Sequence, residues 1–299
     1  MNPAVSIVIP TYNQAHFLKE CLETVRAQTV SDWECIVVNN FSDDDTVAVA
    51  LSFGDRRIRV ENFRNHGVIA ASRNVGIRLA TAPWVAFLDS DDVWFPRKLE
   101  RCLAAAGPDI DLVSHAEAIM RDGRQVGLKV AGDARSTSHR GLLFGNNPLS
   151  PSGVLVRRDL LVELGGFAED AALITAEDYD LWLRLAHRGI RIAFIDEALA
   201  EYRLHGGNAS GSVLRHMNAT LAVMERHAAL IAPSPLDRLR LRAKRAATRY
   251  AAGRSCQAAG RNGEAMVHFL ASLTIWPFAW KAWAAMAIAI LGMARYLYK

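Results

Sequence analysis

The sequence predicts an α/β protein with a mostly parallel sheet flanked by helices, followed by an all-helical C-terminal region. Short apolar runs alternate with segments of helical periodicity about every 20 to 30 residues in the first half of the chain, as in βαβ units. The runs are apolar along their whole length, which is typical of strands covered on both faces. From about Ser212 the sequence becomes rich in Ala and Arg and lacks strand patterns. We therefore expect two domains, 1–211 and 212–299.

The composition is that of an ordinary globular protein. The 299 residues are 51% hydrophobic and 22% charged, with a net charge of +4 and a pI of about 9.0. This mild positive charge does not indicate a nucleic-acid partner, and we expect none. The N-terminus runs directly into a strand pattern without the features of a signal peptide. The cysteines are far apart and have no metal-site spacing, so we expect buried, reduced thiols in a cytoplasmic protein.

In the first half, each predicted strand ends in turn or polar residues. Strands are predicted at 4–9, 34–38, 58–61 and 85–88. Helices are predicted at 17–28, 46–53, 68–79 and from about Pro96, and Ser42 or Asp43 can cap the second of them. The carboxyl ends of parallel strands meet at one edge of a sheet, where open α/β sheets bind ligands. A shared crevice would therefore collect Thr11, Asn39, Asn40, Asp89 and Asp91.

The run at 85–88 stops at once in the acidic turn Asp89-Ser90-Asp91-Asp92. Three neighbouring carboxylates repel one another unless a cation or a solvated turn relieves the repulsion. Carboxylate oxygens at this place suit Mg²⁺ or Mn²⁺, and such an ion in turn suits a diphosphate. The alternative is an acidic loop that only caps the following helix.

After residue 99 the pattern changes. Segments 112–120 and 125–130 flank Arg121-Asp122-Gly123-Arg124, which predicts a β-hairpin. The segment 131–147 is irregular and rich in Gly and Ser, so we expect a loop on the acceptor side of a site. A strand is predicted at 148–156, helices at 158–164 and 177–187, and a strand at 190–195. The helix at 177–187 begins with Glu177, Asp178 and Asp180, whose simplest role is N-capping.

The C-terminal region is expected to be helical throughout, with breaks at Ala252-Gly253 and Ala259-Gly260. Its last helix, predicted at 277–298, has an apolar run of about a dozen residues, too short to span a bilayer. Trp280 and Trp283 lie at the start of this helix, and the flanking cations are Lys281, Arg295 and Lys299. Together with the basic cluster at 238–249, these features are compatible with a helix at the membrane interface. The interpretation that we favour is a helix buried against its neighbours.

Seven motifs in one order resemble those of family 2 glycosyltransferases with the GT-A fold, over residues 5–210. They are VSIVIPTYN (5–13), IVVNNFSDDDT (36–46), ASRNVGI (71–77), FLDSDDVWFPRKL (87–99), GGF (165–167), EDYDLWLRL (177–185) and YRLHGGNAS (202–210). Each motif alone is weak, whereas seven in order are specific. The resemblance implies an inverting, metal-dependent transfer of a sugar from a nucleotide-diphosphate donor to a hydroxyl acceptor.

The resemblance assigns donor-binding residues. Pro10, Thr11 and Tyr12 match the loop after the first strand, which holds the nucleotide. Asn39 and Asn40 stand where the family commonly has an acidic pair, and Asn40 matches the Asp that contacts the base. An Asn offers both a donor and an acceptor to a pyrimidine edge, so the nucleotide stays open, with a UDP-sugar expected. The remaining matches to residues at the base, the phosphates and the donor sugar are Arg73, Asp89 and Ser90.

The resemblance also assigns the metal and the catalytic groups. Asp91 matches the direct ligand of Mn²⁺ or Mg²⁺, and His205 matches a histidine at the metal and diphosphate. Such a cation stabilises the leaving diphosphate as a Lewis acid. Asp178 matches the base that takes the proton of the acceptor hydroxyl, and we expect the helix dipole to keep it ionised. Glu177 is expected near the acceptor.

The resemblance also implies an acceptor, a biological process and a cellular location. Members of this family act on lipid-linked glycans, surface polysaccharides and protein-attached sugars, so we expect a glycan or lipid-linked glycan acceptor in cell-surface glycan or polysaccharide biosynthesis. The location would be the cytoplasm, at the inner face of the membrane if the C-terminal helices contact it.

Three other functions are weighed against this one. A nucleotidyltransferase would have a Gly-rich, basic loop after the first strand, and the sequence there has none. A nucleotide-sugar-binding module without turnover is favoured only by the double Asn at 39 and 40. The GxGxxG fingerprint of a dinucleotide-binding oxidoreductase is absent from the sequence.

Overall fold

The computed structural model describes residues 3–205 and 212–290. The predicted domain boundary at 211/212, the end of the 202–210 motif, and the last part of the predicted C-terminal helix with Arg295 and Lys299 lie outside the described residues. The described chain forms two compact units. The first comprises 3–142, 147–171 and 177–205, and the second comprises 143–146, 172–176 and 212–290.

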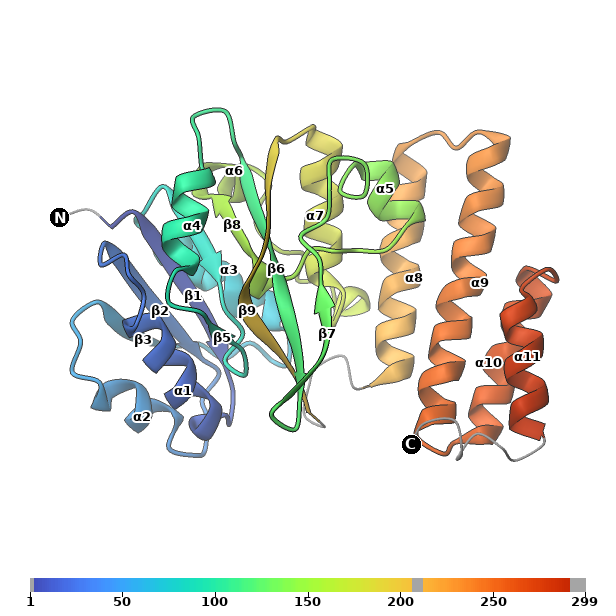
Figure 1. The fold of residues 1–299 in the computed structure, drawn as a ribbon, viewed down its shortest axis with the longest axis horizontal. Helices are drawn as coiled ribbons and strands as arrows, with labels where there is room; N and C mark the ends of the chain where they lie inside the picture. Colours follow the sequence, from blue (N-terminus) through green and yellow to red (C-terminus); the bar gives the residue numbers. More distant parts are fainter. Residues whose placement is uncertain (1–2, 206–211, 291–299) are drawn as a thin grey trace. The chain divides into compact units, whose positions relative to one another are not determined.

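The first unit is built on a nine-stranded sheet of order β3-β2-β1-β4-β8-β6-β9-β5, with β7 paired to β6 (Figure 1). The strands are β1 (Val5–Thr11), β2 (Trp33–Asn39), β3 (Ile58–Asn62), β4 (Trp84–Phe87), β5 (Val93–Trp94), β6 (Leu112–Arg121), β7 (Arg124–Lys129), β8 (Val154–Arg157) and β9 (Ile192–Leu204). The α/β class and the predicted hairpin of β6 and β7 are confirmed.

The sheet is mixed beyond β4. Strands β3, β2, β1 and β4 are mutually parallel, as expected. Strand β8 then lies antiparallel between β4 and β6, and only β6 and β9 are parallel in this half. The predicted fold class is therefore confirmed, with antiparallel pairings added after β4, where the βαβ alternation of the sequence ends.

Helices cover the sheet of the first unit and make up most of the second. They are α1 (Ala15–Arg26), α2 (Thr46–Ser52), α3 (Ile69–Leu79), α4 (Lys98–Ala105), α5 (His139–Phe144), α6 (Arg158–Glu163), α7 (Glu177–Arg188), α8 (Val213–Leu230), α9 (Pro235–Ala258), α10 (Asn262–Ile275) and α11 (Trp280–Ile290). The short helix α5 interrupts the segment 131–147, which we expected to be wholly irregular. Short 3₁₀ turns lie at Pro151–Gly153 and Ala171–Leu173.

The core of the first unit follows from the apolar periodicity of the sequence. Helix α1 buries Leu18, Cys21, Leu22 and Val25, which lie at helical spacing on one face. Helix α3 packs closely on β1, because a Cβ atom at Gly76 would lie 2.2 Å from Val8 Cγ1. All four cysteines are buried and unpaired, as expected. This packing fixes the strand ends from which the site residues project.

In the second unit, α8 to α11 lie side by side as helical hairpins (Figure 1). A capping box of Ser234 and Asp237 starts α9. The predicted break at Ala252-Gly253 is wrong: α9 continues through Gly253, where a Cβ atom would lie 2.5 Å from the Phe269 ring. The break at Ala259-Gly260 is confirmed, with Gly260 at φ +75° after the helix end.

The loop between α10 and α11 and the first turn of α11 expose aromatic side chains. Phe278 is 80% exposed, Trp280 is 69% exposed and Trp283 is 55% exposed. Lys281 Nζ lies 5.8 Å from the centre of the Trp280 ring. Across residues 3–205 and 212–290, no helix combines the length and the apolar character that a membrane crossing requires.

Candidate active site

The predicted crevice lies at the carboxyl ends of β1, β2 and β4. Thr11 and Asn39 end β1 and β2 in register with each other. Pro10 and Thr11 are the last residues of β1 and not part of a loop, which corrects the expectation; Tyr12 is the first loop residue. The hydroxyl of Thr11 is buried, and it has no hydrogen-bond partner among the described residues. Tyr12 is 52% exposed at the edge of the crevice.

Four hydrogen bonds join the loop after β1 to the loop after β2. The Asn13 backbone N–H donates to Ser42 Oγ (2.9 Å), and the Asp43 backbone N–H donates to Asn13 Oδ1 (2.8 Å). The backbone N–H groups of residues 14 and 15 donate to Thr46 Oγ1 (3.2 Å) and Asp44 Oδ2 (3.0 Å). The two loops therefore form one connected wall.

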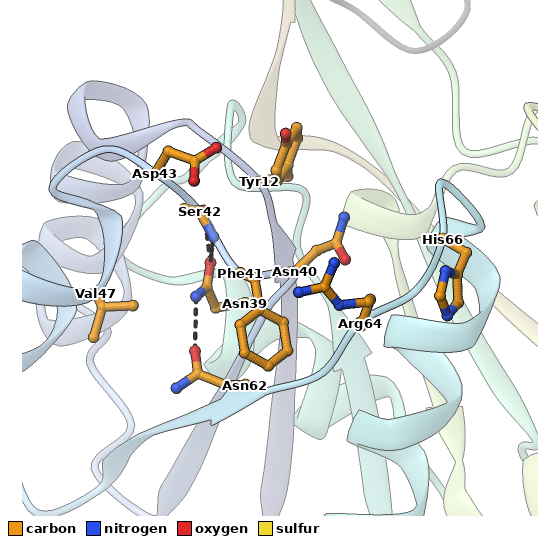
Figure 2. A pocket seen from close by; sticks show the side chains of 10 residues that line it. All are labelled: Tyr12, Asn39, Asn40, Phe41, Ser42, Asp43, Val47, Asn62, Arg64 and His66. Carbon is orange, nitrogen blue, oxygen red and sulfur yellow. Dashed lines mark hydrogen bonds between the residues drawn. The ribbon is translucent and has the colours of Figure 1, made fainter.

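This wall borders an open pocket of about 610 Å³ (Figure 2). The pocket combines amides, an aromatic ring and a cation; its lining includes Tyr12, Asn39, Asn40, Phe41, Asn62 and Arg64. Two residues of the lining, Phe41 and His66, have left-handed backbone conformations with φ 53°. A bulky residue rarely adopts this conformation, and such strain is common where a fold supports a ligand.

The acidic turn after β4 is held by contacts from three directions. Asp91 Oδ2 lies 2.8 Å from His205 Nε2. The Ser90 hydroxyl donates to Gln14 Oε1. Asp92 is buried and accepts from Ser152 Oγ (2.7 Å) and from the Arg203 backbone N–H (3.0 Å). Asp92 is thus a structural group that fixes the turn, a role that the sequence did not indicate.

Burial and mutual repulsion act on the carboxylates of this turn. Burial and the charge of Asp89 raise the pKa of Asp91, and the contact with His205 opposes the rise. Burial, with repulsion from Asp89 and Asp91, raises the pKa of Asp92 well above its usual range. A bound cation would relieve this repulsion.

Arg73 links the acidic turn to the start of α7. Arg73 is only 3% exposed. It donates to Asp89 Oδ1 (2.7 Å) and to Glu177 Oε1 (2.7 Å). Its Cζ also lies 5.3 Å from the centre of the Phe167 ring. The structure therefore brings together three of the predicted residues from α3, the turn after β4 and α7.

Asn74, the next residue on α3, holds the GGF motif. Its amide exchanges two hydrogen bonds with the Phe167 backbone, at 2.9 Å and 2.8 Å. A Cβ atom at Gly166 would lie 2.2 Å from Asn74 Oδ1, so only glycine fits there. Arg184 of α7 donates to the Gly166 carbonyl oxygen (2.7 Å). The motif thus fixes α7 against α3, a function of Asn74 that sequence reasoning missed.

Asp178 is partly buried beside Glu177. Burial and then the Glu177 charge raise the pKa of Asp178 to about 6, while the Arg73 charge opposes the rise. This direction is opposite to the one expected from the helix dipole, because burial outweighs it. The carboxylate accepts from the backbone N–H of the adjacent Tyr179 (2.7 Å). A carboxylate with a pKa near neutrality is suited to accept a proton.

Sequence reasoning also missed three buried polar side chains, those of Lys98, His115 and Glu117. Lys98 of α4 is fully buried with its Nζ 3.6 Å from the centre of the Trp94 ring, and burial lowers its pKa to about 8. Glu117 of β6 is buried and accepts from the Ser150 hydroxyl. Burial also lowers the pKa of His115 to about 3, so the imidazole is neutral. No spacing in the sequence marks these residues.

The predicted residues fall into two groups. The pocket holds Tyr12, Asn39 and Asn40, while the ionic group holds Arg73, Asp89 and Glu177, with Asp91 and His205 in contact beside it. Within the part of the chain that the structure describes, no cluster of three or more His, Cys, Asp or Glu side chains is arranged to hold a metal ion. A cation here would need oxygen ligands from a substrate or water in addition to the protein.

Two family models match the chain. The model of glycosyl transferase family 2 matches residues 6–161, and that of glycosyl transferase family group 2 matches residues 84–298. The chain belongs to glycosyltransferase family 2. It is therefore a transferase, as the seven motifs predicted. The family match covers the loops, the acidic turn and α3 described above.

Relatives of known sequence agree with this membership. An uncharacterized glycosyltransferase of Rickettsia prowazekii is 29% identical over 223 residues, which cover 72% of this chain and 69% of that protein. The putative glycosyltransferase EpsE of Bacillus subtilis is 28% identical over 207 residues, covering 67% of this chain and 73% of that protein.

Solved structures of glycosyltransferases share the GT-A fold with this chain. S. aureus TarS 1–349 in complex with UDP-GlcNAc aligns with a TM-score of 0.64 at 20% identity, covering 98% of this chain and 87% of TarS. The mannosyltransferase PcManGT from Pyrobaculum calidifontis, in complex with GDP-Man and Mn²⁺, aligns with a TM-score of 0.63 at 20% identity, covering 100% of this chain and 82% of that protein. At this identity the likeness shows the fold alone.

Proposed function

We propose that the protein is an inverting, metal-dependent glycosyltransferase that moves a sugar from a nucleotide-diphosphate donor to a hydroxyl acceptor. The observation that carries the proposal is the buried link Asp89–Arg73–Glu177, with 2.7 Å on each side of Arg73. This link sets the acidic turn, where a diphosphate and cation would bind, beside the start of α7, which carries Asp178. The leaving group and the base are then held on one rigid frame.

Asp178 is the proposed general base. Its pKa of about 6 leaves it largely ionised at neutral pH and basic enough to take a proton from the acceptor hydroxyl. Glu177 is the proposed acceptor-side neighbour, and its negative charge strengthens the basicity of Asp178. Arg73 limits this effect, because its cation favours the ionised form of Asp178 and so lowers its pKa.

Asp91 and His205 are the proposed protein ligands of the divalent cation. Mg²⁺ and related ions at phosphate sites are held by one or two protein carboxylates together with substrate phosphates and water. The Asp91–His205 pair, at 2.8 Å, supplies one such carboxylate and adds an imidazole nitrogen. Mn²⁺ or Mg²⁺ would supply Lewis-acid stabilisation of the leaving diphosphate. The Mn²⁺ in the PcManGT complex supports this choice.

For the donor, we propose a nucleotide sugar bound by the β1 and β2 loops. Residues 10–12 and Asn40 would hold the nucleoside, Asn39 would support the loop that carries Asn40, and Arg73, Asp89 and Ser90 would lie toward the phosphates and sugar. The ligands named for TarS and PcManGT, UDP-GlcNAc and GDP-Man, support a nucleotide sugar but differ in the base. The resemblance favours a UDP-sugar.

For the acceptor, we propose a hydroxyl of a glycan or lipid-linked glycan in cell-surface glycan or polysaccharide synthesis. The support is the family resemblance. We also propose that 1–211 is the catalytic domain and 212–299 a helical accessory domain.

We further propose that the accessory domain contacts the inner face of the membrane from the cytoplasm. Residues 212–290 contain eleven Lys or Arg and three Asp or Glu, and cations attract anionic headgroups by about 1 kcal/mol each near the surface. The exposed Phe278, Trp280 and Trp283 are side chains that favour the membrane interface.

The test is a thermal-shift screen of UDP-, CDP-, dTDP- and GDP-sugars with and without Mn²⁺, because a ligand that binds only the folded protein raises its melting temperature. We expect a shift that requires both the nucleotide sugar and the cation. Hydrolysis of the stabilising nucleotide sugar then separates an enzyme from a binding module without turnover. A panel without any shift would contradict the proposed function.

A further inference from the structure

The orientation of the Asn40 amide is fixed by a backbone group. Asn40 Oδ1 accepts a hydrogen bond from the Asn65 backbone N–H at 2.9 Å. A backbone nitrogen can only donate, so the atom that faces it must be the amide oxygen. The Nδ2 group, which has no hydrogen-bond partner among the described residues, is left on the pocket side with two N–H donors.

The Asn39 amide is fixed in the same way. Its Oδ1 accepts from the Ser42 backbone N–H (3.2 Å) and hydroxyl (2.6 Å), and its Nδ2 donates to Asn62 Oδ1 (2.7 Å), as the dashed lines in Figure 2 show. Both lone-pair directions of Asn39 Oδ1 are therefore occupied within the wall. Asn39 is 2% exposed and contributes no acceptor to the pocket.

Next to these amides lie the Phe41 ring and the Arg64 guanidinium. The Phe41 side chain is 49% exposed, and Arg64 Cζ lies 5.0 Å from the centre of its ring. Arg64 forms no ion pair or hydrogen bond with the described residues, so its N–H groups add further donors. A planar base can stack on a ring or a guanidinium. Two polar groups of the pocket lining, the Asn40 amide and the Arg64 guanidinium, are then donors, while Asp43 of the same lining is an acceptor.

We propose that the Asn40 amide donor faces ring position N3 of the base of the nucleotide donor, and that the selected pyrimidine is cytosine. This inference rests on the proposed function. The ring nitrogen N3 of cytosine accepts hydrogen bonds, whereas N3 of uracil and thymine carries a hydrogen. A donor facing a donor leaves both groups without a partner, which lowers affinity. The inference departs from the UDP-sugar that the resemblance favours.

The chain offers a sharp test of this role. In Asn40→Asp, one carboxylate oxygen can still accept from the Asn65 N–H, and the second oxygen replaces Nδ2 with an acceptor. The variant should therefore favour uracil. Asn39→Asp is the matched control, because it adds the same charge to the same wall while its side chain faces Ser42 and Asn62. The exposed Asn62 amide can turn to donate to the new carboxylate.

The experiment is isothermal titration of CDP and UDP, with Mn²⁺ present, into the wild type and both variants. The ratio of the two dissociation constants cancels the general effect of an added negative charge. We expect the wild type to bind CDP more tightly than UDP by roughly 5- to 150-fold. We expect Asn40→Asp to reverse the preference and Asn39→Asp to retain it.

Tighter binding of UDP by the wild type, or a ratio that Asn40→Asp leaves unchanged, would overturn the inference alone. The wild-type ratio decides the matter even if a variant does not fold. If none of the nucleotides CDP, UDP, GDP and dTDP binds, the proposed function fails, and this inference fails with it.

Discussion

Arg73 and Glu177 lie 104 positions apart in the chain, and Arg73 Nη1 donates a 2.7 Å hydrogen bond to Glu177 Oε1 in the protein interior. The same guanidinium holds Asp89. In Arg73→Met, two carboxylates lose their shared cation, and we expect the free energy of unfolding to fall by about 3–5 kcal/mol. Urea denaturation measures the loss.

Arg101→Met is the control for this variant. Arg101 pairs with Glu197 at 2.9 Å, but both side chains are more than 40% exposed. Exposed pairs contribute about 0–1 kcal/mol. Equal effects of the two substitutions would contradict the structural role assigned to Arg73.

Asp178→Asn tests the general base. The amide keeps the shape of the side chain but cannot take a proton, so we expect near-normal donor binding and a loss of turnover of about 10² or more. Wild-type turnover should rise with pH through about 6, as the base ionises. Steady-state rates across pH 5–8, with donor binding measured separately, check both expectations. An unchanged rate would contradict the assignment.

The same substitution has a predicted effect on stability. Folding raises the pKa of Asp178 from 3.8 to about 6, so its stabilising effect is complete below about 3.8 and is lost as pH rises through about 6. The amide that replaces the carboxylate does not ionise. The variant should therefore be more stable than the wild type at pH 7, by on the order of 1–3 kcal/mol, and the difference should vanish near pH 4. Lower stability at pH 7 would favour a helix-capping role.

Asp91→Asn tests the cation site. An amide is a weaker ligand than a carboxylate, so we expect loss of transfer and of the Mn²⁺-dependent part of nucleotide-diphosphate binding. Titration of UDP and CDP with Mn²⁺ or with a chelator measures this. Asp109→Asn, which changes an exposed carboxylate paired with Arg191, should behave as the wild type. Full activity of the Asp91 variant in chelator would overturn metal dependence.

Gly76→Ala tests the packing of α3 on β1. The added methyl group would lie 2.2 Å from Val8 Cγ1, and overpacking of this kind costs about 1–3 kcal/mol. Gly263→Ala in α10 is the control, because no atom lies within 4 Å of the position that its Cβ would take. It should leave stability unchanged or raise it by up to about 1 kcal/mol. Thermal and urea unfolding compare the two variants.

Membrane contact is tested by flotation with anionic vesicles. We expect the wild type to float at low salt and to be released as salt rises, because screening weakens the attraction of its cations. Phe278→Ser combined with Trp280→Ser should reduce flotation, while Leu51→Ser, which removes an exposed apolar side chain from α2, should not. Wild-type protein that stays in the soluble fraction at every salt concentration would contradict the contact.

Local patterns predicted most elements of the fold, and the misses depend on distant partners. The apolar run of β9 is interrupted by Asp196 and Glu197, so the sequence indicated a strand ending at 195. The strand continues to Leu204 because β6 pairs with it across two register shifts. The two-residue strand β5 exists only through its pairing with β9. Gly253 predicted a break, but its lack of a side chain instead makes room for Phe269.

In the candidate site, too, local features were predicted and contacts with distant residues were missed. The acidic turn and the paired Asn residues could be predicted because each follows a strand end, which is a local feature of the sequence. The Asn74–Phe167 contact joins α3 to a motif 93 positions away, which no local pattern encodes. The pKa of Asp178 was expected to be held down by the helix start, whereas burial by distant parts of the chain raises it.

The hydrogen bonds that join Asn13 to Ser42 and Asp43 also affect the kinetics with which the pocket binds a ligand. Loops that must become ordered on binding lose conformational entropy, and that loss subtracts from affinity. Here the two loops already restrain each other before any nucleotide arrives. Nucleotide association should therefore be a single fast step, without a slow rearrangement after the encounter.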